Sequence, residues 1–116
     1  MTQFELEEHH ADDPHMVVLA LAGELDLTNA SELGQRLESV PSSDSSLVLD
    51  LTRVAFIDSA ALHVLFRTAR DLGKERFGLV VGPVSAIART LEIVGMSGVA
   101  TLAGSVDDVT AELSSV

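Results

Sequence analysis

An Asp-Ser pair stands between two apolar runs in the stretch AFIDSAALHVL, residues 55–65. The residues before the pair are typical of a strand that ends in a turn, and those after it of the start of a helix. Asp and Ser both favour helix N-caps, because their side-chain oxygens accept hydrogen bonds from free backbone N–H groups. The same end of a helix also tolerates an added anion, such as a phosphate on a serine. Ser59 is therefore either a simple helix cap or a residue that is chemically modified.

The residues after the pair predict a helix from Ser59 to about Gly73, with its faces set by the turn of about 100° per residue. Its core-facing stripe is predicted to hold apolar side chains only: Leu62, Leu65, Phe66, Ala69 and Leu72. The side that carries Ser59 is predicted to be basic, with His63, Arg67, Arg70 and Lys74. Val64 falls away from the predicted core stripe, so we expect its side chain to be exposed beside Ser59.

Other residues that could do chemistry form weaker patterns. Asp26, Asp50 and Asp58 could converge at the C-terminal ends of strands, where they could act as acid and base or hold Mg²⁺. His63 follows Ser59 by one helical turn, but the pair lacks the strained G-x-S-x-G turn of a hydrolase. The His and Asp residues within 9–15 are more typical of a solvated turn than of a metal site. We therefore assign no catalytic residue, cofactor or metal site.

Strand and helix patterns alternate along the chain in the order β-β-α-β-α-β-α-β-α. Strands are predicted at residues 4–8, 16–22, 47–51, 77–81 and 99–102, and helices at about 29–39, 59–73, 85–94 and from Ser105 onward. Asn29 and Glu32 have the spacing of a capping box for the first helix. The order predicts a single α/β domain over residues 1–116, with frayed ends at 1–3 and 115–116. Its sheet is expected to be mixed but mostly parallel, with about four helices packed on it.

The composition restricts the function classes. The 116 residues carry a net charge of −11, and residues 1–50 hold eleven acids and one base. This acidity argues against nucleic acid, and it fits either a basic protein surface as partner or solubility alone. No apolar run approaches the roughly 20 residues that span a bilayer, and no secretory signal is visible. With no Cys, the chain suits a reducing compartment. We expect a cytoplasmic protein with no membrane partner, either a monomer or a weak dimer.

Four stretches resemble the STAS fold of anti-sigma factor antagonists. The central one is VLDLTRV followed by FIDS, residues 48–54 and 56–59, and it is the most specific. The others are GELD at residues 23–26, PVSAIARTLEIVGMSGV at 83–99 and SVDDVTAEL at 105–113. The resemblance covers residues 4–115 and implies a STAS-type domain.

The resemblance also implies a partner-switching role. In that family, the serine at the position of Ser59 is phosphorylated by an anti-sigma factor that is itself an ATP-dependent serine kinase. The unphosphorylated antagonist binds the anti-sigma factor and so frees a sigma factor for transcription, and a phosphatase of the PP2C type restores that form. The expected phosphoacceptor is Ser59, and the expected partner surface comprises Glu24, Asp26, Asp58, Ala60, Ala61, His63, Val64 and Arg67.

The two residues after Ser59 depart from the family pattern, which usually has Ser or Thr followed by Gly. Ala60 leaves Ser59 as the only hydroxyl at this point. Ala61 adds a methyl group that stiffens the helix start and could obstruct the close approach of a kinase.

Two other functions remain open from the sequence. One is an unmodified STAS subunit or scaffold, for example of a transport ATPase complex. The other is an enzyme that uses Ser59 and nearby carboxylates, which the sequence disfavours.

Overall fold

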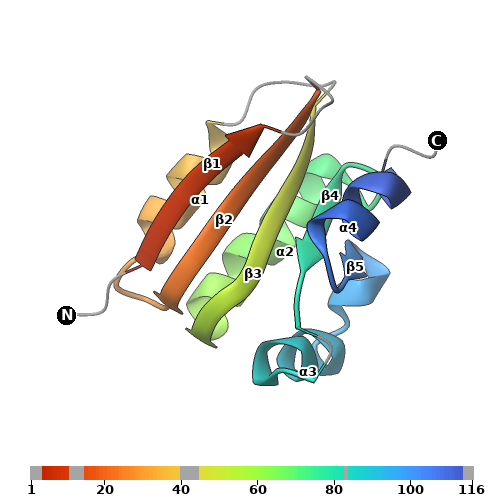
Figure 1. Ribbon diagram of the computed structural model, residues 1–116. Helices are drawn as coiled ribbons and strands as arrows, with labels where there is room; N and C mark the ends of the chain where they lie inside the picture. The colour runs from red at the N-terminus through yellow and green to blue at the C-terminus, as the bar shows by residue number, and fades with distance from the viewer. Residues whose placement is uncertain (1–3, 11–14, 40–44, 83, 114–116) are drawn as a thin grey trace.

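The computed structural model describes residues 4–10, 15–39, 45–82 and 84–113. Its strands form one sheet in the order β1-β2-β3-β4-β5 (Figure 1). They are β1 (Phe4–His10), β2 (Met16–Leu25), β3 (Ser46–Ile57), β4 (Phe77–Val80) and β5 (Thr101–Ala103). Strand β1 runs antiparallel to β2, whereas the other neighbouring pairs are parallel. The predicted mixed, mostly parallel sheet is confirmed.

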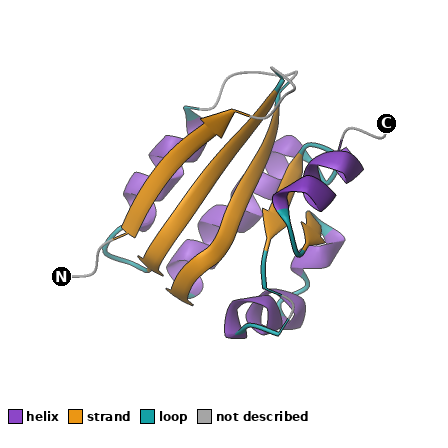
Figure 2. Ribbon diagram, viewed as in Figure 1, coloured by secondary structure: helices purple, strands orange, loops and turns teal. Residues whose placement is uncertain are grey.

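The described residues contain four α-helices and one 3₁₀ helix, which lie on the two faces of the sheet (Figure 2). The α-helices are α1 (Ala30–Glu38), α2 (Ser59–Leu72), α3 (Ala86–Ile93) and α4 (Val106–Leu113), and the 3₁₀ helix is η1 (Met96–Gly98). Ser85 and Ser105 cap α3 and α4, because their hydroxyls accept the backbone N–H of Ala88 and Asp108 at 3.0 and 3.1 Å. None of the described helices has the length and apolar content to cross a membrane.

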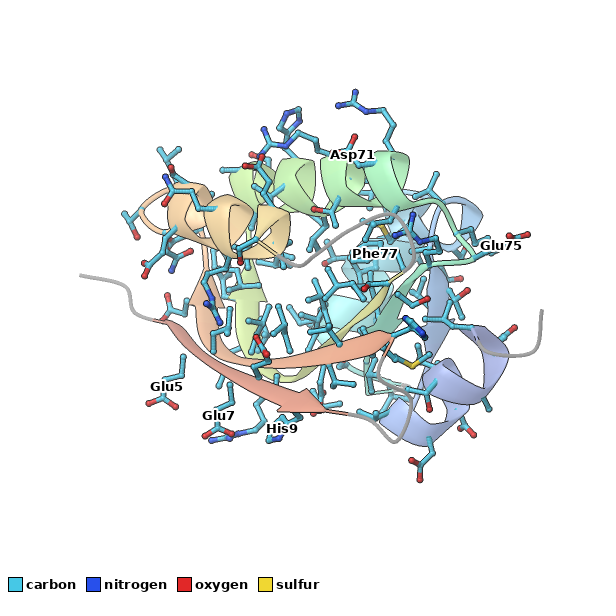
Figure 3. The ribbon with its side chains drawn as sticks, turned by 90° about the horizontal axis from the view of Figure 1, so that it is seen from above. Glu5, Glu7, His9, Asp71, Glu75 and Phe77 are labelled. Atoms are coloured by element: carbon cyan, nitrogen blue, oxygen red, sulfur yellow. The ribbon has the colours of Figure 1, made fainter. Side chains whose placement is uncertain are left out.

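The apolar side chains gather in two clusters on opposite faces of the sheet. The larger cluster joins alternate residues of β2 and β3 to the buried faces of α1, α2 and α3. The smaller cluster lies under α4 and consists of Met16, Val18, Val48, Val80, Val109 and Leu113. On β1, Glu5, Glu7 and His9 point away from α1 and α2, so this edge strand has a polar outer surface (Figure 3). The two cores therefore hold the helices on both faces, as the alternating element order predicts.

Three strands are longer than predicted, and two of them, β2 and β3, extend toward Asp58. Strand β2 continues through Gly23 to Leu25, and β3 continues from the predicted end at Leu51 to Ile57. Their register shifts between Ala20 and Ala22 and again between Gly23 and Glu24. At each shift β3 carries one extra residue, which interrupts the alternation of buried and exposed side chains. Because the alternation is interrupted, the sequence pattern predicts a strand that ends too early.

The approach of α4 to the sheet depends on Gly78 in β4. A methyl group at this position would overlap Cγ1 of Val109 and would come within 3.3 Å of Cδ1 of Leu113. We therefore expect Gly78→Ala to lower the free energy of unfolding by about 1–3 kcal/mol, as overpacking does in other cores. Urea denaturation followed by circular dichroism measures this change.

Gly98 is the matched control, because a methyl group there would meet no atom within 4 Å. Gly98→Ala should change the stability by no more than about 0.5 kcal/mol. Equal losses for the two variants would contradict the close packing of α4.

Candidate functional site

The Asp58 carboxylate joins the start of α2 to the loop between β2 and α1. Its Oδ1 accepts the backbone N–H of Ala61 at 3.0 Å, which makes Asp58 the N-cap of α2. Its Oδ2 accepts the backbone N–H of Leu27, also at 3.0 Å. The backbone N–H of Asp58 donates to the carbonyl of Leu25 at 3.1 Å, so the strand ends are also joined. One side chain therefore fixes the relative position of two segments that are far apart in sequence.

Ser59 occupies the first position of α2 and is exposed. Within the described part of the chain, its hydroxyl has no hydrogen-bond partner. The interpretation of Ser59 as the helix cap is therefore wrong, because Asp58 has that role. The Ser59 hydroxyl is free to react at the N-terminal end of a helix, where backbone N–H groups and the helix dipole favour an anion.

The loop between β2 and α1 is held by its own polar side chains. Asn29 is 5% exposed, its Oδ1 accepts the backbone N–H of Asp26 at 3.0 Å, and its Nδ2 donates to the carbonyl of Glu24 at 2.8 Å. Asp26 Oδ1 accepts the backbone N–H of Thr28 at 2.9 Å. The capping box predicted for Asn29 and Glu32 does not form, because the Asn29 side chain turns back to bind the loop. The loop therefore has a defined shape beside Asp58.

A groove runs between α1 and α2, directly after Ser59. It has a volume of about 460 Å³ and is lined by Ala30, Ser31, Gly34, Gln35, Glu38, Ala60, His63, Val64 and Arg67. Arg67 spans the groove, with its Nη2 at 4.0 Å from Oε1 of Glu38. A methyl group on Gly34 would lie 3.0 Å from the same Nη2, so the absence of a side chain there leaves room for Arg67. The predicted surface residues Ala60, His63 and Arg67 therefore share this groove.

The predicted exposure of Val64 is wrong, and Ala61 is also inaccessible. Val64 is 6% exposed and Ala61 is fully buried. Helix α2 packs against both the sheet and α1, so its buried surface is wider than one stripe. A helical wheel assumes one buried face and places Val64 on the solvent side. The Ala61 methyl group points into the core and does not obstruct a kinase, whereas Val64 offers only a small exposed area where it lines the groove.

The basic stripe is shorter than predicted. Helix α2 ends at Leu72, and Gly73 adopts a positive φ of 85°. Lys74 therefore lies beyond the helix, and His63, Arg67 and Arg70 remain on it.

The other predicted constellations do not join this site. Asp50 lies within β3, where it pairs in register with Ala20 and Val80 and accepts the backbone N–H of Thr52 at 3.0 Å. Only Asp26 and Asp58 of the three carboxylates reach the β2–α1 loop. In the residue 9–15 cluster, Asp12 and Asp13 lie outside the described residues. Within the described ranges, no group of three or more His, Asp or Glu side chains is arranged to hold a metal ion.

Two exposed apolar residues near Asp58 were missed by the sequence analysis. Leu27 is 77% exposed in the β2–α1 loop, and Phe56 is 48% exposed near the end of β3. Leu27 stands among polar residues in ELDLTN, which is the only sequence signal for its exposure. Phe56 gives no such signal, because its exposure depends on the second register shift of β3.

This fold is that of a STAS domain. The sequence model of the STAS domain family matches residues 4–109, and the chain belongs to that family. It is 34% identical over 88 residues to the anti-sigma-F factor antagonist RsfB of Mycobacterium tuberculosis, an alignment covering 74% of this chain and 71% of RsfB.

Solved structures agree with this assignment. The crystal structure of an anti-sigma factor antagonist from Mycobacterium paratuberculosis has a TM-score of 0.83 at 28% identity and covers 96% of this chain and 94% of its own. The anti-sigma factor antagonist SpoIIAA in its unphosphorylated form has a TM-score of 0.70 at 17% identity, over 98% of each chain, which is a likeness of fold.

The two neighbouring residues Asp58 and Ser59 should differ sharply in their effect on stability. Asp58→Ala removes the acceptor for both Ala61 and Leu27, and we expect it to lower the free energy of unfolding by about 1–2 kcal/mol. Ser59→Ala removes no hydrogen bond made within the described ranges and should change the free energy of unfolding by no more than about 0.5 kcal/mol. Chemical denaturation of both variants measures the difference, and a larger loss for Ser59→Ala would show that Ser59 is the cap.

Proposed function

We propose that this protein is an anti-sigma factor antagonist that is switched by phosphorylation of Ser59. The observation that carries the proposal is the division of roles between Asp58 and Ser59. Asp58 caps α2, which leaves the Ser59 hydroxyl exposed and unpaired among the described residues. A kinase can therefore reach this hydroxyl without opening the fold. The names of the relatives support the choice of an anti-sigma factor as partner.

The proposed chemical step is a phosphoryl transfer from ATP. The Ser59 oxygen attacks the γ-phosphorus, the bond to the β-phosphate oxygen breaks, ADP leaves and the hydroxyl proton passes to a base of the kinase. The partner is an anti-sigma factor that is itself the serine kinase, so it supplies the ATP and the catalytic groups. Hydrolysis of the phosphoserine by a PP2C-type phosphatase returns the free hydroxyl and inorganic phosphate. This protein acts as a binding module and as the substrate of both enzymes.

The electrostatics of the site explain how a phosphate could change binding and leave the fold intact. A phosphate adds about −1.5 to −2 charge and three acceptor oxygens. At the first position of α2, the free N–H groups and the helix dipole stabilise it. The new charge also stands beside Asp58 and near the exposed Glu24 and the loop residue Asp26. A partner surface that fits the unphosphorylated site would then face a much larger negative charge.

In the proposed cycle, the unphosphorylated protein binds the anti-sigma factor and so frees a sigma factor for transcription. The phosphorylated protein dissociates from it. The net charge of −11 supports a basic partner surface, because opposite charges steer two proteins together.

Substitutions of Ser59 test the switch on purified proteins. Each ATP-binding anti-sigma factor of the source organism is titrated with the wild-type protein, Ser59→Ala and Ser59→Asp in a calorimeter. We expect Ser59→Ala to bind like wild type and Ser59→Asp to bind at least about tenfold more weakly, because like charges then meet in the interface. Incubation with ATP should transfer phosphate to the wild-type protein and not to Ser59→Ala.

Ser97→Asp is the charge-matched control, since Ser97 is an exposed serine of η1. It should leave the affinity within about twofold of wild type, because Ser97 is outside the predicted partner surface and an exposed charge contributes little. Equal affinities of Ser59→Ala and Ser59→Asp would contradict the switch and favour an unmodified scaffold.

A further inference from the structure

Leu27 and Phe56 are two exposed apolar residues near Asp58. Leu27 is 77% exposed and Phe56 is 48% exposed. Leu27 is tied directly to Asp58 through its backbone N–H, and Phe56 precedes Asp58 by two residues. A single exposed apolar residue is ordinary on a protein surface. Two such residues close in the structure to Asp58, which precedes Ser59, form a small contact surface.

The loop that carries Leu27 is fixed before any partner binds. On one side of Leu27, Asn29 and Asp26 are joined by a hydrogen bond of 3.0 Å, and on the other Asp58 accepts the Leu27 N–H. The backbone of Leu27 is therefore held although its side chain projects into solvent. Binding through a pre-ordered side chain loses less conformational entropy than binding through a flexible one. This order suits Leu27 to insert into a pocket.

Acidic side chains surround this apolar surface. Glu24 pairs in register with Phe56, Asp26 precedes Leu27, and Asp58 binds the Leu27 N–H and follows Phe56 by two residues. The complementary surface is an apolar pocket with a basic rim. A kinase presents such a rim where it binds ATP, because Lys or Arg side chains, helix N-termini and metal ions hold the phosphates. The charges around Leu27 therefore fit the region beside the nucleotide site of a kinase.

We propose that Leu27, supported by Phe56, is the anchor that inserts into an apolar pocket beside the nucleotide site of the anti-sigma factor kinase. This inference rests on the proposed function and adds the chemistry of the contact. Leu27 contributes to the affinity for the partner, and the phosphate on Ser59 adds the charge that weakens binding. Since Leu27 takes no part in phosphoryl transfer, it strengthens substrate and transition-state binding equally.

The test measures binding and phosphorylation of Leu27→Asn by each purified ATP-binding anti-sigma factor of the source organism. We expect an affinity at least about tenfold below wild type, in the range found for central anchors of protein interfaces. In the kinase reaction, KM should rise by a similar factor while kcat stays unchanged. This result is expected when a lost contact stabilised the bound substrate and the transition state equally. Phe56→Ser should weaken binding by a smaller factor.

Val99→Asn is the control, since Val99 is also exposed, at 37%, and follows η1 beyond α3. It should leave affinity and KM within about twofold of wild type. The melting temperatures of all three variants should stay close to wild type, because none of these residues is buried.

The outcomes separate this inference from the proposed function. Wild-type affinity of Leu27→Asn, together with weak binding of Ser59→Asp, would overturn the anchor and leave the switch intact. Weak binding of Leu27→Asn, together with full binding of Ser59→Asp, would support the anchor and overturn the switch. A fall in kcat at unchanged KM would show that Leu27 acts on catalysis and would also overturn the anchor. If no anti-sigma factor binds the wild-type protein, both proposals fail.

Discussion

The two hydrogen bonds accepted by the Asp58 carboxylate are the constraint on which the site depends. One oxygen holds the first turn of α2 through Ala61, and the other holds the β2–α1 loop through Leu27. Because a carboxylate has two oxygens, Asp58 can accept both hydrogen bonds. A serine in the same position would have a single oxygen to reach both donors. The order Asp-Ser also matters. With the acid as the cap, the serine is the first helical residue, and its hydroxyl stays exposed.

The long β2–β3 pair brings Asp58 to the place where it can make these bonds. Leu25 and Ile57 are paired in register at the ends of the two strands, and the Asp58 N–H then donates to the Leu25 carbonyl. The two register shifts allow β3 to carry extra residues while Leu51, Val54 and Ile57 all remain in the core. Without the shifts, strict alternation would turn some of these residues to the solvent face. The irregular strand therefore preserves the core and aligns the functional loop.

The sequence patterns predict most of the fold. They are wrong for residues that contact a second element of the fold, which a local pattern does not take into account. The element order is confirmed, because it depends on short apolar runs and on the turn residues between them. The predicted exposure of Val64 is wrong, because α1 covers a side of α2 that a helical wheel with one buried face assigns to solvent. The predicted capping box at Asn29 does not form, because the Asn29 side chain donates instead to the backbone carbonyl of Glu24. Leu27 and Phe56 are absent from the predicted surface, because their exposure depends on strand register and loop closure.

The position of Ser59 separates the stability of the domain from the affinity of its surface. The proposed phosphate at the start of α2 would meet favourable N–H groups, so the folded state would tolerate the modification. The same phosphate lies beside Asp58 and the acidic loop, so a partner that approaches this surface meets strong like-charge repulsion if its own charges do not compensate. In this arrangement, the charge of the phosphate would lower the affinity for the partner while the stability of the domain changes little. An apolar contact such as the one proposed for Leu27 would be unaffected by the added charge, so a site that combines the two could bind tightly in one state and still dissociate in the other.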